Sequence, residues 1–156
     1  MKNAIYPGSF DPFTNGHLDI VKKAVMLFDH VYLVIGINSS KKRNFAADKM
    51  KLAMEKTIQE LGIQNCSVCL CEGLVAEFAK ENGIYYMIRG LRNNMDYNYE
   101  ENIAMVNKLI NPELESIFFR AENAALSSSM VKELHSYGLD VTEYVPGPVL
   151  RCILDK

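Results

Sequence analysis

Short apolar segments alternate with longer amphipathic segments along the whole chain, and this alternation limits the possible folds more than any other feature of the sequence. The clearest apolar segment is residues 31–37, VYLVIGI. A continuous apolar run of this length is typical of a strand that is buried on both faces of a sheet. Strands that alternate with helices pair in parallel, because each helix returns the chain to the same end of the sheet. We therefore predict an α/β fold with a mostly parallel sheet and helices on both of its faces.

The remaining elements follow from local patterns of apolar residues and turn residues. Further strands are predicted at residues 3–7, 66–71, 85–88 and 116–119. Helices are predicted at residues 16–28, 48–61, 74–81, 96–110 and 127–137, with a last short helix after a loop at residues 146–148. Asp48 is the predicted N-cap of the second helix, and Gly62 and Gly138 are predicted to end helices. The 156 residues contain no composition break, linker or repeat, so we expect a single domain, residues 1–156.

The composition disfavours several classes of function. A formal net charge of −2 disfavours a nucleic-acid substrate, since proteins that bind a polynucleotide backbone usually carry a strongly basic surface. No apolar run is long enough to span a bilayer, and the first residues lack the apolar stretch of a signal peptide. We therefore expect a cytoplasmic protein with no nucleic-acid or membrane partner.

Four cysteines, at positions 66, 69, 71 and 152, raise the question of a metal or redox site. Cys66, Cys69 and Cys71 belong to one predicted strand, on which Cys66 faces the opposite side from the other two. No histidine lies near them in the sequence, so their spacing does not indicate a zinc site. We interpret them as structural thiols and predict no metal site made by protein side chains.

The segment most indicative of chemistry is residues 7–17, PGSFDPFTNGH, between the first predicted strand and the first predicted helix. Gly8 allows the backbone to approach a ligand closely, and Gly16 and His17 open the helix. The N-terminus of a helix attracts anions through its free N–H groups and its dipole. We therefore expect His17 to donate a hydrogen bond to a phosphate oxygen. The alternative is a tight turn with an exposed histidine, which the unusual composition of the whole segment disfavours.

Three further segments place cations and hydroxyl groups at the same edge of the predicted sheet. They are residues 88–92, IRGLR, residues 126–129, LSSS, and residues 39–43, SSKKR. Arginine forms bidentate contacts with phosphate, and serines at a helix start offer hydroxyl and N–H groups to an anion. Taken singly, these segments could be exposed arginines, a helix cap and a solvated basic loop. Their shared position near the carboxyl ends of strands indicates a polyphosphate ligand.

The motifs resemble those of one enzyme superfamily. The Walker phosphate loop and the three-glycine dinucleotide fingerprint are absent, which disfavours a kinase or an ordinary dehydrogenase. Residues 8–17, GSFDPFTNGH, resemble the nucleotidyltransferase signature (T/H)xGH, and the serines at 127–129 resemble the second signature of that superfamily. Over nearly its whole length the chain is similar to bacterial phosphopantetheine adenylyltransferases. The matching segments include residues 6–8, 28–31, 88–92, 111–115 and 131–133.

This resemblance implies a Rossmann-like fold and assigns roles to individual residues. The catalytic residues that it implies are His17, Lys41 and Arg92. Among these, His17 corresponds to the group that stabilises the transition state. The implied ATP contacts are Ser9, Phe10, His17, Gly90, Leu91, Arg92, Glu100, Asn123, Ala124, Ala125, Leu126, Ser127, Ser128 and Ser129. The implied phosphopantetheine contacts are Ser9, Lys41, Leu74, Val75, Arg89 and Glu133. The resemblance also implies Mg²⁺ bound with ATP, a homohexamer, and feedback binding of coenzyme A.

Three parts of the chain depart from the family pattern. Ser9 stands where many members have threonine, and Val75 stands where some members have methionine. Residues 119–125 differ from the corresponding segment of some members, which contains a methionine-proline pair and an aromatic residue. Two alternative functions remain. One is nucleotidyl transfer to another phosphate acceptor, such as nicotinate mononucleotide, where relatives usually have histidine in place of Thr14 and lack the IRGLR segment. The other is a nucleotide-binding domain without turnover, which the complete set of cationic residues disfavours.

The chemistry of adenylyl transfer to a phosphate needs no general base. A phosphate monoester has a second pKa of about 6, so at pH 7 it is mostly a dianion that can attack the α-phosphorus of ATP directly. Asp11 is the nearest candidate base, but the Asp11-Pro12 pair is expected to shape the turn instead. We therefore expect catalysis by positioning and by electrostatic stabilisation.

Overall fold

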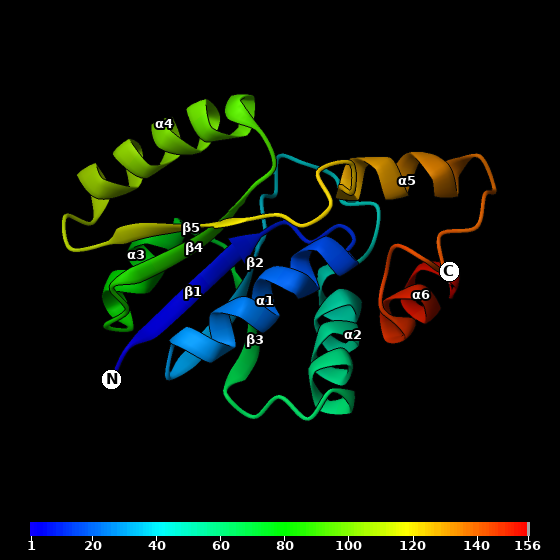
Figure 1. Ribbon diagram of the computed structural model, residues 1–156, viewed down its shortest axis with the longest axis horizontal. Helices are drawn as coiled ribbons and strands as arrows, with labels where there is room; N and C mark the ends of the chain where they lie inside the picture. The colour runs from blue at the N-terminus through cyan, green and yellow to red at the C-terminus, as the bar shows by residue number, and fades with distance from the viewer. Residues whose placement is uncertain (156) are drawn as a thin grey trace.

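Five parallel strands form one central sheet, with the strand order β3-β2-β1-β4-β5. The computed structural model describes residues 1–155, apart from the side chains of residues 94 and 95. The strands are β1 (Asn3–Gly8), β2 (His30–Gly36), β3 (Cys66–Cys71), β4 (Tyr86–Leu91) and β5 (Glu115–Arg120) (Figure 1). The helices are α1 (Asn15–Leu27), α2 (Ala47–Glu60), α3 (Val75–Glu81), α4 (Asn94–Ile110), α5 (Ser128–Ser136) and α6 (Gly147–Leu154). The predicted α/β fold with a parallel sheet is therefore confirmed.

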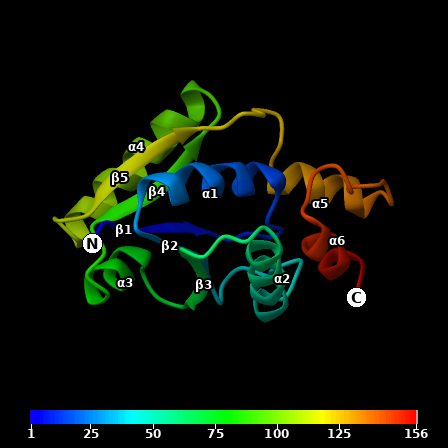
Figure 2. The ribbon, with the colours of Figure 1, turned by 60° about the horizontal axis from the view of Figure 1, so that its bottom comes forward.

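Helices cover both faces of the sheet. The buried residues of α1 and α2 pack into one layer of the core, and those of α3 pack into the other, which α4 also joins through Ile110. Figure 2 shows α1 on one side of β1 and α3 on the other. Helices α5 and α6 extend past the end of the sheet to which the arrow of β1 points in Figure 1. The carboxyl ends of the strands therefore face the start of α5.

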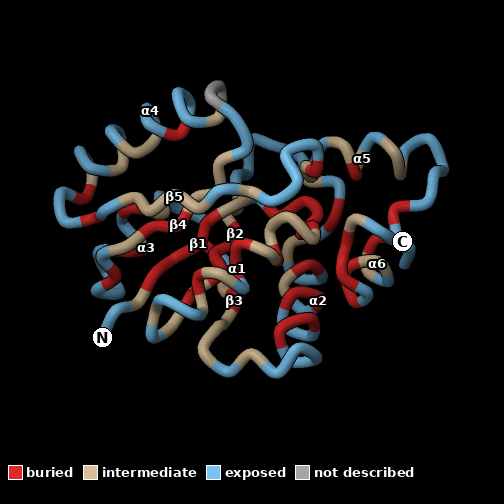
Figure 3. The backbone as a smooth tube through the Cα atoms, in the orientation of Figure 1, coloured by how far each residue is buried: buried red, intermediate tan, exposed pale blue. Residues whose placement is uncertain are grey.

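The two layers of the core meet at the central strands. In β1, Ala4 and Tyr6 belong to the layer of α1 and α2, whereas Ile5 belongs to the opposite layer, as the two-residue period of a strand requires. In β2, Leu33 and Val34 are fully buried in opposite layers, which confirms the interpretation of the continuous apolar run. Burial of each such side chain stabilises the fold by roughly 1.5–3 kcal/mol. Figure 3 shows β1 buried along most of its length, whereas α4 exposes much of its surface.

Three local predictions were wrong in position. Helix α2 has Ala46 at its N-cap and begins at Ala47, so Asp48 lies in the first turn, where a carboxylate suits the helix dipole. Residues 146–148 form the start of α6 and not a loop, because proline fits the first turn of a helix, where N–H groups have no intrahelical acceptor. Strand β4 continues to Leu91, so most of the IRGLR segment lies within the strand and not after it.

Other local predictions are confirmed. Gly62 and Gly138 follow α2 and α5 with φ of 69° and 75°, a conformation in which glycine lacks the steric cost of a side chain. Cys66 packs against the core layer of α1 and α2, whereas Cys69 and Cys71 pack in the opposite layer. Within the described part of the chain, no helix is both long enough and apolar enough to cross a membrane.

Candidate active site

A cavity of about 320 Å³ lies at the carboxyl ends of β1 and β4, the edge of the sheet where the motifs predicted a ligand. Its wall includes the first turn of α1 and the start of α5. The predicted residues on this wall are Ser9, Phe10, His17, Arg89, Gly90, Arg92, Glu100, Asn123, Leu126, Ser127, Ser128 and Ser129. The fold thus brings three of the four predicted segments together around one cavity.

The other predicted residues lie outside the wall of this cavity. Among the described side chains these are Lys41, Leu74, Val75, Leu91, Ala124, Ala125 and Glu133. Lys41 is exposed in a turn after β2, where its backbone N–H donates to the Asn38 carbonyl at 3.0 Å. Leu74 and Val75 start α3 just after β3, so they also lie at the carboxyl edge of the sheet. A ligand must therefore extend out of the cavity to reach Lys41, Leu74 or Val75.

The imidazole of His17 is held in one tautomer by the start of its own helix. Thr14 is the N-cap of α1, and its side chain accepts a hydrogen bond from the backbone N–H of His17 at 3.3 Å. In return, His17 Nδ1 accepts a hydrogen bond from the backbone N–H of Thr14 at 3.0 Å. A neutral imidazole that accepts at Nδ1 carries its proton on Nε2. The capping interaction therefore leaves Nε2–H as the remaining donor.

The surroundings keep His17 neutral. Burial is the largest cause that lowers the pKa of His17, and the positive charges of Arg89 and Arg92 lower it further, to about 4. The ring stacks on Phe13 with 5.6 Å between centroids and meets the edge of Phe10 at 5.0 Å. At neutral pH, His17 is thus an oriented and uncharged hydrogen-bond donor.

Arg89 forms a bidentate ion pair in the cavity. Its Nε and Nη2 donate to the two carboxylate oxygens of Glu100 at 2.6 and 2.7 Å, and Nη1 donates to the Pro7 carbonyl at 3.0 Å. Burial acts to lower the pKa of Arg89, but the hydrogen bonds and charge of Glu100 outweigh it, so the pKa is raised. Since a guanidinium has five N–H bonds, two remain for a phosphate.

Arg92 also has a carboxylate partner, which the sequence reasoning missed. Its Nε and its backbone N–H donate to Asp96 Oδ2 at 2.9 and 3.0 Å, and the hydrogen bond from Arg92 is the largest cause that lowers the pKa of Asp96. Asp96 lines the cavity, as do Tyr6 and Ile20. The four-residue spacing of Arg92 and Asp96 could have indicated this pair. Similarly, the three-residue spacing between His17 and Ile20 places both on one side of α1.

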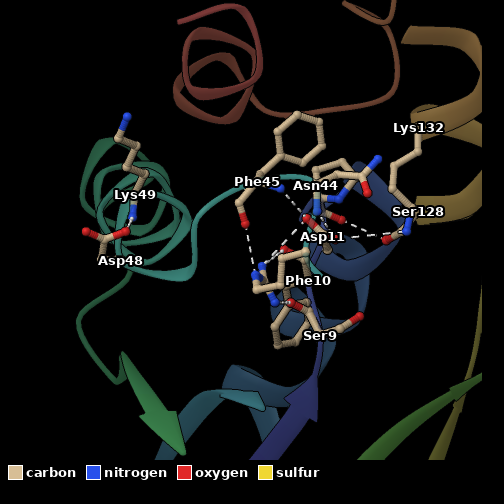
Figure 4. Close-up of polar contacts among 11 residues, drawn as sticks. Ser9, Phe10, Asp11, Asn44, Phe45, Asp48, Lys49, Ser128 and Lys132 are labelled. Carbon is tan, nitrogen blue, oxygen red and sulfur yellow. Dashed lines mark hydrogen bonds and ion pairs between the residues drawn. The ribbon is translucent and has the colours of Figure 1, made fainter. Parts of the chain in front are cut away.

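Asp11 is fully engaged in the structure of its turn. Its Oδ1 accepts from the backbone N–H of Phe45, and its Oδ2 accepts from that of Asn44, both at 2.9 Å (Figure 4). The residue is only 5% exposed. This geometry agrees with the prediction that Asp11 shapes the turn.

The three serines at the start of α5 have different surroundings. Ser127 is the N-cap, and its Oγ accepts from the backbone N–H of Met130 at 3.1 Å. Ser128 Oγ donates to the Pro12 carbonyl at 2.7 Å, which connects α5 to the segment after β1. Ser129 is the second residue of α5 and lies on the cavity wall. The helix start thus presents its N-terminal end to a ligand in the cavity, as expected for an anion site.

The fold and the sequence both match known nucleotidyltransferases. Residues 5–134 match the family described as cytidylyltransferase-like. A crystal structure from Vibrio parahaemolyticus, provisionally named a nicotinate-nucleotide adenylyltransferase, has a TM-score of 0.75 over 99% of this chain and 93% of its own, at 16% identity. The chain therefore belongs to the cytidylyltransferase-like family and shares the fold of the Vibrio structure.

Several relatives identify the family within this class. The phosphopantetheine adenylyltransferase of Lacticaseibacillus paracasei is 45% identical over 99% of this chain and 93% of its own. That of Cytophaga hutchinsonii is 44% identical over 93% of this chain and 97% of its own. That of Lachnoclostridium phytofermentans is 39% identical over 100% of this chain and 96% of its own. The chain belongs to the phosphopantetheine adenylyltransferase family.

Proposed function

We propose that this protein transfers the adenylyl group of ATP to 4′-phosphopantetheine, which gives dephospho-coenzyme A and pyrophosphate in coenzyme A biosynthesis. The observation that carries the proposal is the convergence of His17, two arginines and the starts of α1 and α5 on one cavity. Such a site suits two polyanionic reactants that must be held together against their mutual repulsion. The name that the relatives share supports phosphopantetheine as the acceptor.

In the proposed reaction, an oxygen of the acceptor phosphate attacks the α-phosphorus of ATP in line. A bond forms between these two atoms, and the bond from the α-phosphorus to the pyrophosphate oxygen breaks. Since the acceptor dianion already carries its electron pair, no proton has to be removed. The Nε2–H of His17 would donate to an oxygen of the α-phosphate, where negative charge increases in the transition state. Arg92 would bind the phosphates of ATP after exchanging its contact with Asp96.

Mg²⁺ would arrive with ATP and not as a resident metal. Within the part of the chain that the structure describes, no three His, Cys, Asp or Glu residues are grouped so that they could hold a metal ion. Mg²⁺ is commonly held by phosphate oxygens and water with few protein ligands, so the cavity fits an ion carried by the triphosphate. When bound, the ion would neutralise charge on the leaving pyrophosphate.

The acceptor would extend from the cavity along the carboxyl edge of the sheet. Arg89, which has two N–H bonds without an acceptor among the described residues, would contact its phosphate, and Lys41 would meet it from the turn after β2. Leu74 and Val75, at the start of α3, would contact the methyl and methylene groups of the pantetheine chain, and Glu133 of α5 would lie near it. These assignments rest on the resemblance together with the positions of the residues.

Assembly, feedback and location are further parts of the proposal. On α4, Tyr99, Met105, Val106 and Leu109 are more than half exposed and recur at helical spacing, which suits contact with a second copy in a homohexamer. Coenzyme A carries both the adenylyl and the pantetheine groups of the product, so it would compete for the same cavity. We place the enzyme in the cytoplasm.

Release of pyrophosphate from ATP tests the proposal directly. The protein would be incubated with Mg²⁺–ATP and either 4′-phosphopantetheine, nicotinate mononucleotide or no acceptor. We expect release of pyrophosphate only in the sample that contains phosphopantetheine. Release with nicotinate mononucleotide alone would support the first alternative, and ATP binding without any release would support a non-catalytic domain.

A further inference from the structure

Arg43 joins two segments that approach the cavity from different strands. Its guanidinium donates to three backbone carbonyls: Nη1 to Ser9 at 2.5 Å, Nη2 to Phe10 at 3.1 Å and Nε to Phe45 at 2.9 Å. Ser9 and Phe10 follow β1, whereas Phe45 immediately precedes the N-cap of α2. The planar fork of arginine can make these contacts together, which the single ammonium of a lysine cannot reproduce.

Asp11 completes the connection between the same two segments. As described above, its carboxylate accepts from the backbone N–H groups of Asn44 and Phe45, which Figure 4 shows on either side of it. Its Oδ1 lies 3.8 Å from Nη2 of Arg43, and its Oδ2 lies 4.0 Å from Nζ of Lys132 in α5. We call Arg43, Asp11 and the three carbonyls held by Arg43 the Arg43 clasp.

The clasp holds a strained part of the backbone. Phe10 has a φ of 44°, in the left-handed region that a residue with a large side chain rarely adopts. Such a conformation persists only where the surroundings determine it from several sides. Here the ring of Phe10 is 1% exposed, and its carbonyl is held by Nη2 of Arg43.

This strained residue also positions the ring of His17. The edge-to-face contact between Phe10 and His17 has 5.0 Å between ring centroids. A change in the backbone at Phe10 would therefore move the surface on which the imidazole rests. On the other side of the clasp, Lys41 precedes Arg43 by two residues, so the clasp also limits where Lys41 can lie.

We propose that Arg43 is a positioning residue for adenylyl transfer, because it locks the Ser9–Phe10 turn to the segment that carries Lys41 and so aligns His17 with the acceptor side of the site. This inference rests on the proposed function and assigns a new residue to the same site. Arg43 itself does not line the cavity in the described structure, so its role is exerted through the backbone that it holds.

Kinetics of Arg43→Ala and Arg43→Lys test the inference, with Lys42→Ala as the matched control. Lys42 is the exposed neighbour of Arg43, so its loss measures the effect of removing one positive charge from the same loop. We expect both Arg43 variants to lose roughly 10- to 100-fold in kcat, the scale of a small misplacement of reacting groups. The KM for ATP should change much less than kcat, and Lys42→Ala should lose much less kcat than either Arg43 variant. Millimolar guanidinium, but not potassium at equal ionic strength, should partly restore Arg43→Ala.

A second measurement needs no activity. The ring Cε1–H resonance of His17 in ligand-free protein reports how the Phe10 and Phe13 rings lie against it. We expect this resonance to shift in both Arg43 variants and to stay in place in Lys42→Ala. The two readouts separate a positioning role from a purely structural one, which would lower the melting temperature but leave kcat per folded molecule unchanged.

The outcomes distinguish this inference from the proposed function. Arg43 variants that are folded and keep kcat within about threefold of wild type, or that leave the His17 resonance unmoved, would overturn the positioning role. A wild-type protein that does not use phosphopantetheine would contradict the proposed function. In that case a shifted His17 resonance in the Arg43 variants would still support the clasp as the device that positions His17.

Discussion

At the scale of single residues, His17 combines two tasks in one side chain. Its Nδ1 completes the cap of α1 by accepting from Thr14, and this contact leaves the proton on Nε2. Because burial and two arginines lower the pKa of His17 to about 4, the ring stays neutral at pH 7 and donates without changing its protonation state. Such a donor stabilises charge in a transition state without acting as an acid or base.

Substitution of His17 should therefore act on turnover more than on ATP binding. We expect His17→Ala to lower kcat by roughly 10²-fold or more, the cost of losing one donor to a transition-state oxyanion. His17→Asn places an acceptor near the position of Nδ1, so it should keep the helix cap and still lose turnover. His30→Ala, at the opposite end of the sheet, is the matched control. Turnover of His17→Ala near that of wild type would refute the assignment.

The two arginines should differ in the ligand that they serve. We expect Arg89→Ala to weaken mainly acceptor binding and Arg92→Ala to weaken mainly ATP binding, each by roughly ten- to a hundred-fold, because charge-assisted hydrogen bonds contribute about 1.5–3 kcal/mol. Titration calorimetry of both variants with both ligands measures this. Equal losses of affinity for both ligands in both variants would contradict the assignment of Arg89 to the acceptor and of Arg92 to ATP.

Their carboxylate partners supply the controls. Arg89→Ala leaves the buried Glu100 without its partner, which destabilises a fold strongly. Since Glu100 also lines the cavity, comparison of the Arg89→Ala/Glu100→Gln double variant with Glu100→Gln alone separates the effect of Arg89 on binding from its effect on folding. Asp96→Asn leaves Arg92 in place and weakens the contact that ATP must displace. This variant should bind ATP more tightly than wild type.

At the scale of elements, the sequence predicts strands and helices well but not the partners of individual side chains. Apolar runs and helical spacing are local signals, so every strand and helix lies within a few residues of its predicted place. The ion pair of Arg89 with Glu100 depends on where α4 packs against the carboxyl end of β4, which no local pattern specifies. Likewise, no local pattern specifies how the turn after β2 is placed, so Lys41 lies at the predicted edge of the sheet but does not line the cavity.

The start of α5 carries a prediction of its own. Ser127→Ala should lower the free energy of unfolding by about 1 kcal/mol, the usual contribution of an N-cap side chain, and should weaken ATP binding at the same helix start. Ser136→Ala, at the other end of α5, removes a serine far from the cavity and is the control. Urea unfolding and ATP titration measure the two effects. A Ser127→Ala variant with unchanged ATP affinity would show that the helix start does not bind the nucleotide.

At the scale of the whole molecule, the parallel sheet gathers groups from distant segments at one edge. The strand order places β1 between β2 and β4, so the segments after these three strands are neighbours. The site thereby obtains donors and cations, while Asp11, the one acid that sequence reasoning considered as a base, is bound within the clasp. The central claim is that the acceptor's own phosphate dianion is the nucleophile and that the protein removes no proton.

The pH dependence of transfer at subsaturating acceptor tests this claim most directly. The rate should rise as pH passes through about 6, the second pKa of the acceptor phosphate, and then flatten. In the ligand-free protein, burial and the charges of Arg89 and Arg92 lower the pKa of His17 to about 4, which is below the pH of this rise. With a phosphonate acceptor of different pKa, this rising limb of the pH profile should shift by the difference between the two pKa values. Unphosphorylated pantetheine should not react. A limb that stays fixed when the acceptor changes, or transfer to unphosphorylated pantetheine, would contradict the mechanism.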